Sequence, residues 1–270
     1  MEPLVLSMVL GTLVGVIAAL TGAGGGILAV PLLVFGLHLT LAQAGPIGLL
    51  ATGVSAALGA LLAHRIGLVR YRAAVLMAVT GMALTPVGLW AAALVPTMPL
   101  TLLFAAVLLY VAYRSYIKAV REAGTASATL NAAFTPCQLD GTIGRLIWTV
   151  PCARVLAGWG MMVGFLSGLL GVGGGFVIVP TLQRYTNLEM RSIVPTSLAV
   201  IALVSVAGAA VSAFSGTMNW AIALPFSGGA LLGMMGGRVV SDRLSGAMLQ
   251  KGFAALCVLV AVGLVVRSAA

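Results

Sequence analysis

The sequence predicts an all-α membrane protein that crosses the bilayer many times and is built from two homologous halves. Three observations predict this fold class. Hydrophobic residues make up 61% of the 270 residues and charged residues only 7%, whereas a soluble domain carries about 25% charged residues. Several apolar stretches are long enough to span the hydrocarbon core, which takes about 20 helical residues. The third observation is a glycine-rich run that occurs once in each half.

The repeat keeps a constant offset along the chain. Residues 20–31 read LTGAGGGILAVP and residues 169–180 read LLGVGGGFVIVP, so the offset is 169 − 20 = 149. The same offset later pairs Gly88 with Gly237 without a gap. In membrane proteins, interrupted helices at corresponding positions of two halves point to a transport site.

We expect eight apolar segments, of which the first in each half is broken by its glycine run. They span residues 4–35, 43–63, 73–94, 100–119, 154–182, 194–214, 220–240 and 248–266. Pro46 and Pro195 fall near the starts of two segments, where proline is tolerated because the N–H it lacks has no partner in a first helical turn.

The segments group into a first transmembrane repeat at 1–122, a polar linker at 123–153 and a second repeat at 154–270. Within the linker, short apolar stretches flank a glycine-containing turn that begins at Asp140. This pattern predicts a small β-hairpin.

The basic residues predict that the two halves are inverted. The loop at 64–72 holds three arginines and its counterpart at 213–220 holds none. The second pair of loops shows the opposite bias, because the loop at 94–100 holds no Lys or Arg and its counterpart region holds Arg243. By the positive-inside rule, corresponding loops then lie on opposite faces of the membrane. Inversion requires an odd number of crossings before the second copy. We favour a re-entrant hairpin at each glycine run, since irregular backbone is tolerated where it lines a cavity; a crossing by the linker is the alternative.

The glycine runs need a reason, because each glycine costs a helix about 1 kcal/mol relative to alanine. A helix that restarts after a break presents free N–H groups at a positive dipole end, which suits an anion. Nearby hydroxyls add donors. The candidate substrate-binding residues are Thr21, Gly22, Gly24, Gly25, Gly26, Pro31, Thr52, Ser55, Gly171, Gly173, Gly174, Gly175, Pro180, Thr196, Ser197 and Ser205. Close helix packing through GxxxG spacing is the competing interpretation.

Other classes of function find little support in the sequence. The apolar spans hold almost no Asp, Glu or His, groups that proton-coupled pumps place in the membrane. Motifs of intramembrane or hydrolytic enzymes are absent, so we predict no enzyme. The three cysteines show no metal spacing, and we expect no metal and no cofactor. The net charge of +9 lies in loops, where it sets orientation and meets anionic lipid rather than nucleic acid.

The two glycine motifs resemble the twin signatures of the TauE/SafE sulfite exporter family, as do Gly67-Leu-Val-Arg-Tyr and Pro195-Thr-Ser-Leu. The resemblance covers nearly the whole chain. It implies a multi-pass permease of the bacterial inner membrane that exports small sulfur-containing anions, such as sulfite or organosulfonates. The family pattern often has Thr-Ser-Leu in both halves, whereas the first half here reads Ile47-Gly-Leu. At this point of the repeat, hydroxyl groups that could bind substrate are therefore expected only in the second half, on Thr196 and Ser197.

Two alternatives stay open at this point. One is an uptake permease for sulfate, thiosulfate or a carboxylate, and the other is a membrane scaffold subunit that transports nothing. The expected partners are a small sulfur anion and membrane lipid, and a homodimer is left open.

Overall fold

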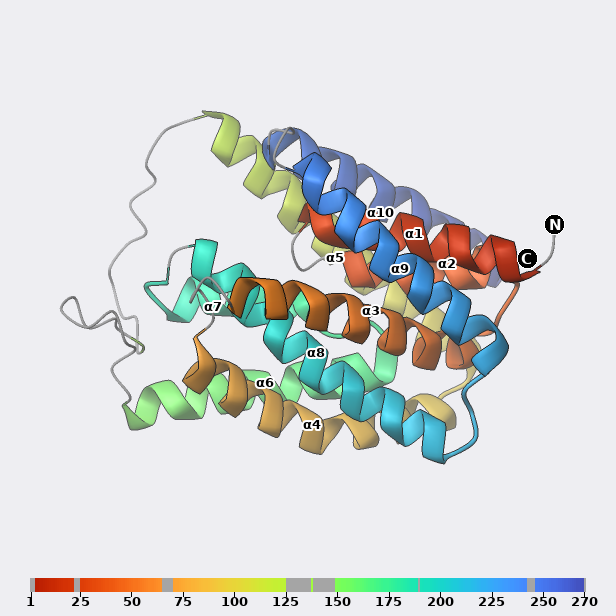
Figure 1. The fold of residues 1–270 in the computed structure, drawn as a ribbon, viewed down its shortest axis with the longest axis horizontal. Coiled ribbons are helices and arrows are strands. Elements are labelled where there is room, and N and C mark those ends of the chain that lie inside the picture. The colour runs from red at the N-terminus through yellow and green to blue at the C-terminus, as the bar shows by residue number, and fades with distance from the viewer. Residues whose placement is uncertain are drawn as a thin grey trace.

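The computed structural model describes residues 3–21, 25–64, 70–124, 137, 149–188, 190–241 and 246–269. These residues form ten α-helices and one short 3₁₀ helix (Figure 1). The elements are α1 (Pro3–Thr21), η1 (Gly25–Leu28), α2 (Ala29–Gly36), α3 (Leu41–His64), α4 (Tyr71–Leu94), α5 (Thr97–Gly124), α6 (Val150–Leu170), α7 (Gly175–Tyr185), α8 (Met190–Phe214), α9 (Trp220–Ser241) and α10 (Gly246–Ala269).

The prediction of an all-α polytopic membrane protein is confirmed. In the described part, six helices are long and apolar enough to span a membrane, namely α3, α4, α5, α6, α8 and α9. Shorter apolar stretches occupy Leu4–Leu20, Gly26–Gly36 and Gln250–Val266. Large apolar side chains such as Trp90 and Leu259 are exposed on the outside, as expected of a surface that meets lipid rather than water.

The helices α3 and α8 are counterparts in the repeat, and they pack against each other at the centre of the molecule (Figure 1). A Cβ placed on Gly59 of α3 would lie 3.0 Å from a methyl of Leu198, and one placed on Gly208 of α8 would lie 2.8 Å from a methyl of Leu49. In the repeat, Gly59 corresponds to Gly208 and Leu49 corresponds to Leu198 (59 + 149 = 208; 49 + 149 = 198). The same glycine–leucine contact therefore occurs twice, once with the glycine on α3 and once with the glycine on α8. The two helices therefore cross antiparallel, as a two-fold relation between the halves requires.

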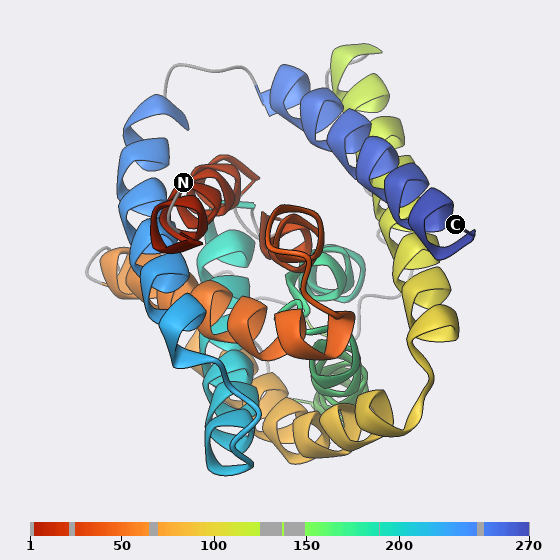
Figure 2. The same ribbon diagram turned by 90° about the vertical axis from the view of Figure 1, so that its right-hand side faces the viewer.

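The outer helix pairs repeat this exchange. Helix α1 packs on α9, and its counterpart α6 packs on α4. Gly15 leaves room for no side chain because the backbone of Ala230 lies against it, and Gly164 is pressed in the same way against Gly81. Since 15 + 149 = 164 and 81 + 149 = 230, these contacts also correspond. Small residues at such positions let membrane helices approach backbone to backbone. Helices α5 and α10 form a further pair along one flank (Figure 2).

The chain reverses direction at each glycine run. Gly36 at the end of α2 comes back to Leu10 near the middle of α1. In the second half, Gly174 lies against Val163, and the ring of Tyr185 at the end of α7 lies 6.1 Å from that of Trp159, nearer the start of α6. The orientation of the two halves relative to a bilayer, and hence the inverted repeat, stays a prediction.

Helices α3 and α8 begin earlier than the apolar segments predict. As a result Pro46 and Pro195 lie inside these helices, in the second turn, rather than in the first. Each proline removes one backbone hydrogen bond at that place. The two prolines occupy the same position in their helices, in keeping with the repeat.

Between residues 125 and 148 the structure describes only Cys137, so the predicted β-hairpin lies outside the described residues. Cys137 forms a disulfide with Cys152 in the first turn of α6, a pairing that the sequence did not suggest. Its backbone also pairs with Thr186, just after α7, in an isolated parallel bridge. Helix α6 starts at Val150, within the segment predicted as linker.

Candidate functional site

The second glycine run forms a tight turn between α6 and α7. Helix α6 ends where Gly171 takes φ +71° and donates its N–H to the carbonyl of Ser167 at 2.8 Å. Gly173 and Gly174 follow at φ +75° and +71°. This left-handed region costs residues with a side chain about 1–2 kcal/mol each, so the run needs glycine to turn the chain back on itself.

Helix α7 starts directly after this turn. The N–H groups of Val177 and Ile178 bond to the carbonyl of Gly174 at 3.0 and 3.3 Å. The N–H groups that precede them have no acceptor within a helix, and they lie at the positive end of the helix dipole. The start of α7 is therefore suited to an anion.

The two glycine runs meet at α3. A Cβ placed on Gly26 would lie 2.7 Å from the methyl of Thr52 and 3.1 Å from the carbonyl oxygen of Val172. One placed on Gly173 would lie 3.2 Å from the hydroxyl oxygen of Thr52 and 3.0 Å from that of Ser205. Thr52 thus stands between the two breaks, and the absence of side chains on both glycines makes this approach feasible.

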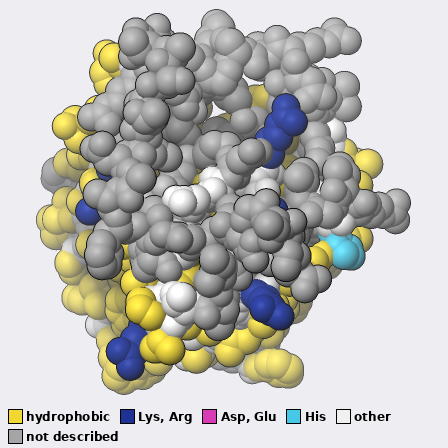
Figure 3. All heavy atoms as spheres, turned by 90° about the vertical axis from the view of Figure 1, so that its left-hand side faces the viewer, with side chains coloured by type: hydrophobic (Ala, Val, Ile, Leu, Met, Phe, Trp, Pro, Cys, Tyr) yellow, Lys and Arg dark blue, Asp and Glu magenta, His cyan; other side chains and the backbone are white. Residues whose placement is uncertain are grey.

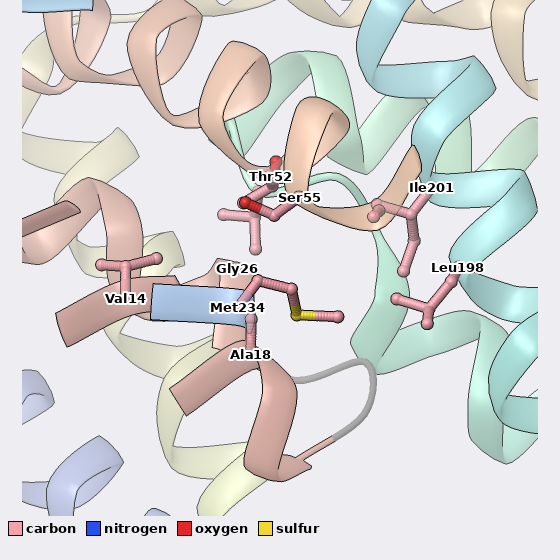
Figure 4. Close-up of a pocket in the computed structure, with 10 residues that line it drawn as sticks. Val14, Ala18, Gly26, Thr52, Ser55, Leu198, Ile201 and Met234 are labelled. Carbon is pink, nitrogen blue, oxygen red and sulfur yellow. The ribbon is translucent and has the colours of Figure 1, made fainter. Parts of the chain in front are cut away.

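A small cavity of about 20 Å³ opens at this junction (Figure 4). Thr52 and Ser55 contribute its hydroxyls, and the labelled apolar side chains surround them. The lining residues are Val14, Ala18, Gly26, Thr52, Ser55, Ala56, Val172, Leu198, Ile201 and Met234. This volume holds about one water molecule, so the cavity as described is too small for a larger solute.

Two serine hydroxyls at this junction have no hydrogen-bond partner among the described residues. Ser55 lines the cavity and Ser205 adjoins Gly173, and both are almost fully buried. An unpaired buried hydroxyl costs about 1–3 kcal/mol. The hydroxyl of Thr52 is different, because it donates to the carbonyl of Gly48 at 2.8 Å. The site therefore holds two donors that a bound solute could use.

The structure brings together one part of the predicted substrate-binding set. Gly26, Thr52, Ser55, Gly173 and Ser205 lie at the junction. Gly171 and Gly174 shape the turn, and Gly175 begins α7. Thr21 and Gly25 end α1 and begin η1, and nothing is described of their surroundings. Gly22 and Gly24 lie outside the described residues.

The other predicted residues lie away from the cavity lining. Pro31 and Pro180 sit inside α2 and α7. The hydroxyl of Thr196 accepts the backbone N–H of Arg70 at 3.1 Å and donates to Ser192. The hydroxyl of Ser197 donates to the carbonyl of Val194. Both hydroxyls are thus engaged in contacts within the protein.

The apolar wall was missed by sequence reasoning. Leu198, Ile201 and Met234 look like any other residue of an apolar span. The repeat offset could have identified two of the wall residues as counterparts of predicted hydroxyls. Ile201 corresponds to Thr52, and Ala56 corresponds to Ser205 (52 + 149 = 201; 56 + 149 = 205). The counterparts of predicted hydroxyls thus lie across the same cavity.

Basic side chains gather at one end of the molecule. Arg70, Arg72, Arg154, Arg184 and Arg191 lie near the ends of α4, α6, α7 and α8 that meet at the left of Figure 1. Lys and Arg side chains are visible on this face in Figure 3. The described lining of the cavity itself contains no charged residue. Within the described residues, no group of His, Cys, Asp or Glu could hold a metal ion.

Comparisons with known proteins agree with this architecture. The family model described as "Sulfite exporter TauE/SafE" matches residues 7–264. A "Probable membrane transporter protein" of Xylella fastidiosa (strain Temecula1 / ATCC 700964) is 29% identical over 99% of this chain and 97% of its own length. Its equivalent in strain 9a5c is 28% identical over the same shares.

The "Probable membrane transporter protein YunE" of Bacillus subtilis (strain 168) is 35% identical over 31% of this chain and 30% of its own length. No solved structure matches significantly. With a family model that covers almost the whole sequence and a fold of apolar membrane-length helices, this chain belongs to the TauE/SafE family of multi-pass membrane transporters.

Proposed function

We propose that the chain exports a small sulfur-containing anion, such as sulfite or an organosulfonate, across the inner membrane of a bacterium. The anion binds between the two glycine breaks, at the junction of α3, α7 and α8. The observation that carries this proposal is a pair of buried hydroxyls that have no partner among the described residues, that of Ser55 in the cavity lining and that of Ser205 beside Gly173.

The chemistry of the junction suits a sulfur oxyanion. Its oxygens accept several hydrogen bonds, and backbone N–H groups and hydroxyls can bind them without a full counter-charge. Among its described residues the cavity offers no cationic side chain. Binding would therefore rest on the N–H groups of α7 and on the two serines, and an anion held this weakly can also leave.

The buried polar groups favour transport without a coupled proton. In the described part of the chain, every polar residue that is buried as a whole is a serine or a threonine. Proton relays use Asp, Glu or His in the membrane. With the cell interior negative, an expelled anion gains about 2.3 kcal/mol per charge for each 100 mV, which is enough to drive export by a uniporter.

Transport requires the cavity to open. The closed cavity has room for about one water molecule, and the side chain of Met234 reaches into it (Figure 4). Methionine has several rotatable bonds and adapts to new surroundings. We propose that rocking of one half against the other opens the site to each face in turn, as in other transporters built from repeats.

The test is efflux from proteoliposomes loaded with sulfite. A potassium diffusion potential that makes the lumen negative should accelerate efflux, and no proton gradient should be needed. Efflux that requires a proton gradient and ignores the potential would contradict the uniport mechanism. Net transport only toward the lumen under every potential would favour uptake, and reconstituted protein that moves no anion would favour a scaffold.

The cargo is identified by thermal stabilisation of the purified protein. Sulfite, thiosulfate, sulfate, sulfoacetate and taurine are compared at equal ionic strength. Sulfite or sulfoacetate should raise the melting temperature most. Stabilisation by sulfate alone would move the assignment to the uptake alternative.

A further inference from the structure

Arg70 lies at the basic end of the molecule, directly before α4, and part of its side chain is buried. The Nε of its guanidinium is inaccessible to solvent and has no hydrogen-bond partner among the described residues. Its backbone N–H donates to the hydroxyl of Thr196, which is fully buried. This contact joins residues 126 positions apart in the chain and fixes Arg70 to the beginning of α8.

A buried guanidinium nitrogen without an acceptor calls for an explanation. Arginine stays charged at every physiological pH, and burying part of a charged group without a hydrogen bond is more costly than burying a neutral one. A site that receives an anion would supply the missing acceptor. The planar guanidinium matches the oxygens of an oxyanion and can bind two of them at once.

The position of Arg70 relates it to the cavity through α8. Thr196, which holds Arg70, precedes the cavity residues Leu198 and Ile201 on that helix. At about 1.5 Å per residue, Thr196 and Ile201 are separated by about 7.5 Å along the helix axis. Solute that approaches the cavity from the basic end therefore passes the level of Arg70 first.

The corresponding position in the other half carries no charge. Because 70 + 149 = 219, the counterpart of Arg70 is Asn219. Asn219 is exposed just before α9, and its side-chain oxygen accepts the N–H of Ala221 at 3.2 Å. The repeat thus places an arginine before α4 and only a helix-capping amide before α9.

We propose that Arg70 is a capture site that binds the oxyanion cargo before it enters the cavity, and that Asn219 leaves the opposite face without one. This inference rests on the proposed function. A guanidinium raises the local concentration of anions at its own face. The transporter is therefore expected to have a lower KM for cargo presented at the basic end than for cargo presented at the other end.

The experiment measures sulfite transport in proteoliposomes of defined orientation, with sulfite presented at the basic end. Arg70→Gln should raise KM about tenfold, as loss of a charge-assisted hydrogen bond predicts, and change the maximal rate less than about twofold. Arg70→Lys keeps the charge, and its KM should lie between the KM of the wild type and that of Arg70→Gln. Arg72→Gln is the matched control, because Arg72 is exposed two residues further along, and its KM should stay as in the wild type.

A second variant tests the asymmetry directly. Asn219→Arg should lower the KM for sulfite presented at the opposite end and leave the KM at the basic end unchanged. The inference is overturned if Arg70→Gln and Arg72→Gln have equal KM values, or if Arg70→Gln lowers only protein yield and maximal rate while Arg70→Lys keeps the wild-type KM. Wild-type protein that carries no sulfite at all would instead contradict the proposed function.

Discussion

The two glycine runs share a sequence pattern but build different parts of one site. The second run turns sharply through three glycines with positive φ and leads directly into α7. The described end of the first run, by contrast, is the 3₁₀ helix η1, which continues into α2. The polar groups differ as well, since Thr52 and Ser55 come from the first half and Ser205 comes from the second. The two halves therefore share a sequence pattern, while the backbone of each glycine run and its individual side chains make the cavity asymmetric.

The largest effect is expected when the turn itself is broken. Gly174→Leu places a side chain at φ +71°, where its Cβ would lie 2.5 Å from a methyl of Val163. We expect sulfite efflux to fall about 100-fold or more, because the start of α7 is displaced. Gly25→Leu should block transport in the same way if the first run is equally important, and a milder loss would show that the second run dominates.

The matched control is Gly158→Leu. Gly158 lies on α6, and no described heavy atom from elsewhere in the fold comes within 4 Å of the point that a Cβ would occupy there. This variant should therefore insert and transport normally. Membrane insertion of all three variants is compared by their yield in the membrane fraction. Normal efflux by both Gly174→Leu and Gly25→Leu would mean that the glycines serve only helix packing.

Removal of a single hydroxyl should have the next largest effect. Hydrogen bonds to charged groups contribute about 1.5–3 kcal/mol, so Ser205→Ala and Ser55→Ala should each weaken sulfite binding about 10- to 100-fold. Ser167→Ala is the control, because Ser167 is also buried, with a hydroxyl that no described residue bonds, but it neither lines the cavity as Ser55 does nor is among the nearest neighbours of Gly173 as Ser205 is. Binding is read from sulfite-dependent thermal stabilisation. Equal losses in all three variants would show that the effect is structural.

The sequence revealed the backbone of this site better than its walls. The offset of 149 identified both glycine runs, and Thr52, Ser55 and Ser205 follow them closely enough in sequence to be suspected. Met234 could not be suspected, because in a membrane protein apolar residues cover the lipid-facing surface as well as the core. The contacts of Thr196 could not be foreseen for a related reason, since its partner Arg70 is distant in the chain and no local pattern shows that the hydroxyl is engaged within the protein.

Met234 offers a test of what the second half adds to the cavity. Its counterpart in the first half is Thr85 (234 − 149 = 85), which is buried and bonded to the carbonyl of Gly81. Met234→Ala should enlarge the cavity and shift the preference a few-fold from sulfite toward the bulkier sulfoacetate, at some cost in stability. Met234→Leu conserves volume and should keep the wild-type preference, as should Met235→Ala on the exposed face. An unchanged preference in Met234→Ala would place the size limit elsewhere.

The smallest effect on transport is expected from the disulfide, which nevertheless distinguishes the two ends of the molecule. Cys152 lies in the first turn of α6, two residues before Arg154, and Cys137 is bonded to it, so the pair lies at the end where the described arginines gather. By the positive-inside rule we predict that this end faces the cytoplasm, where thiols are kept reduced. We therefore expect the pair to be reduced in growing cells and to form the disulfide only on oxidation. Cys137→Ser should change efflux less than about twofold, since neither cysteine belongs to the described lining of the cavity.

The redox state is measured by quenching intact cells with acid, unfolding the protein and alkylating its thiols with a mass-tagged maleimide. Cys257→Ser serves as the background, because Cys257 is a buried free thiol that would otherwise be counted. Two tags per chain indicate a reduced pair and a cytoplasmic basic end. Absence of tags before reduction would place this end on the oxidising side, and the arginines would then mark the outer face. In that case Arg70 would bind anions that arrive from outside the cell, and the proposed direction of transport would change from export to uptake.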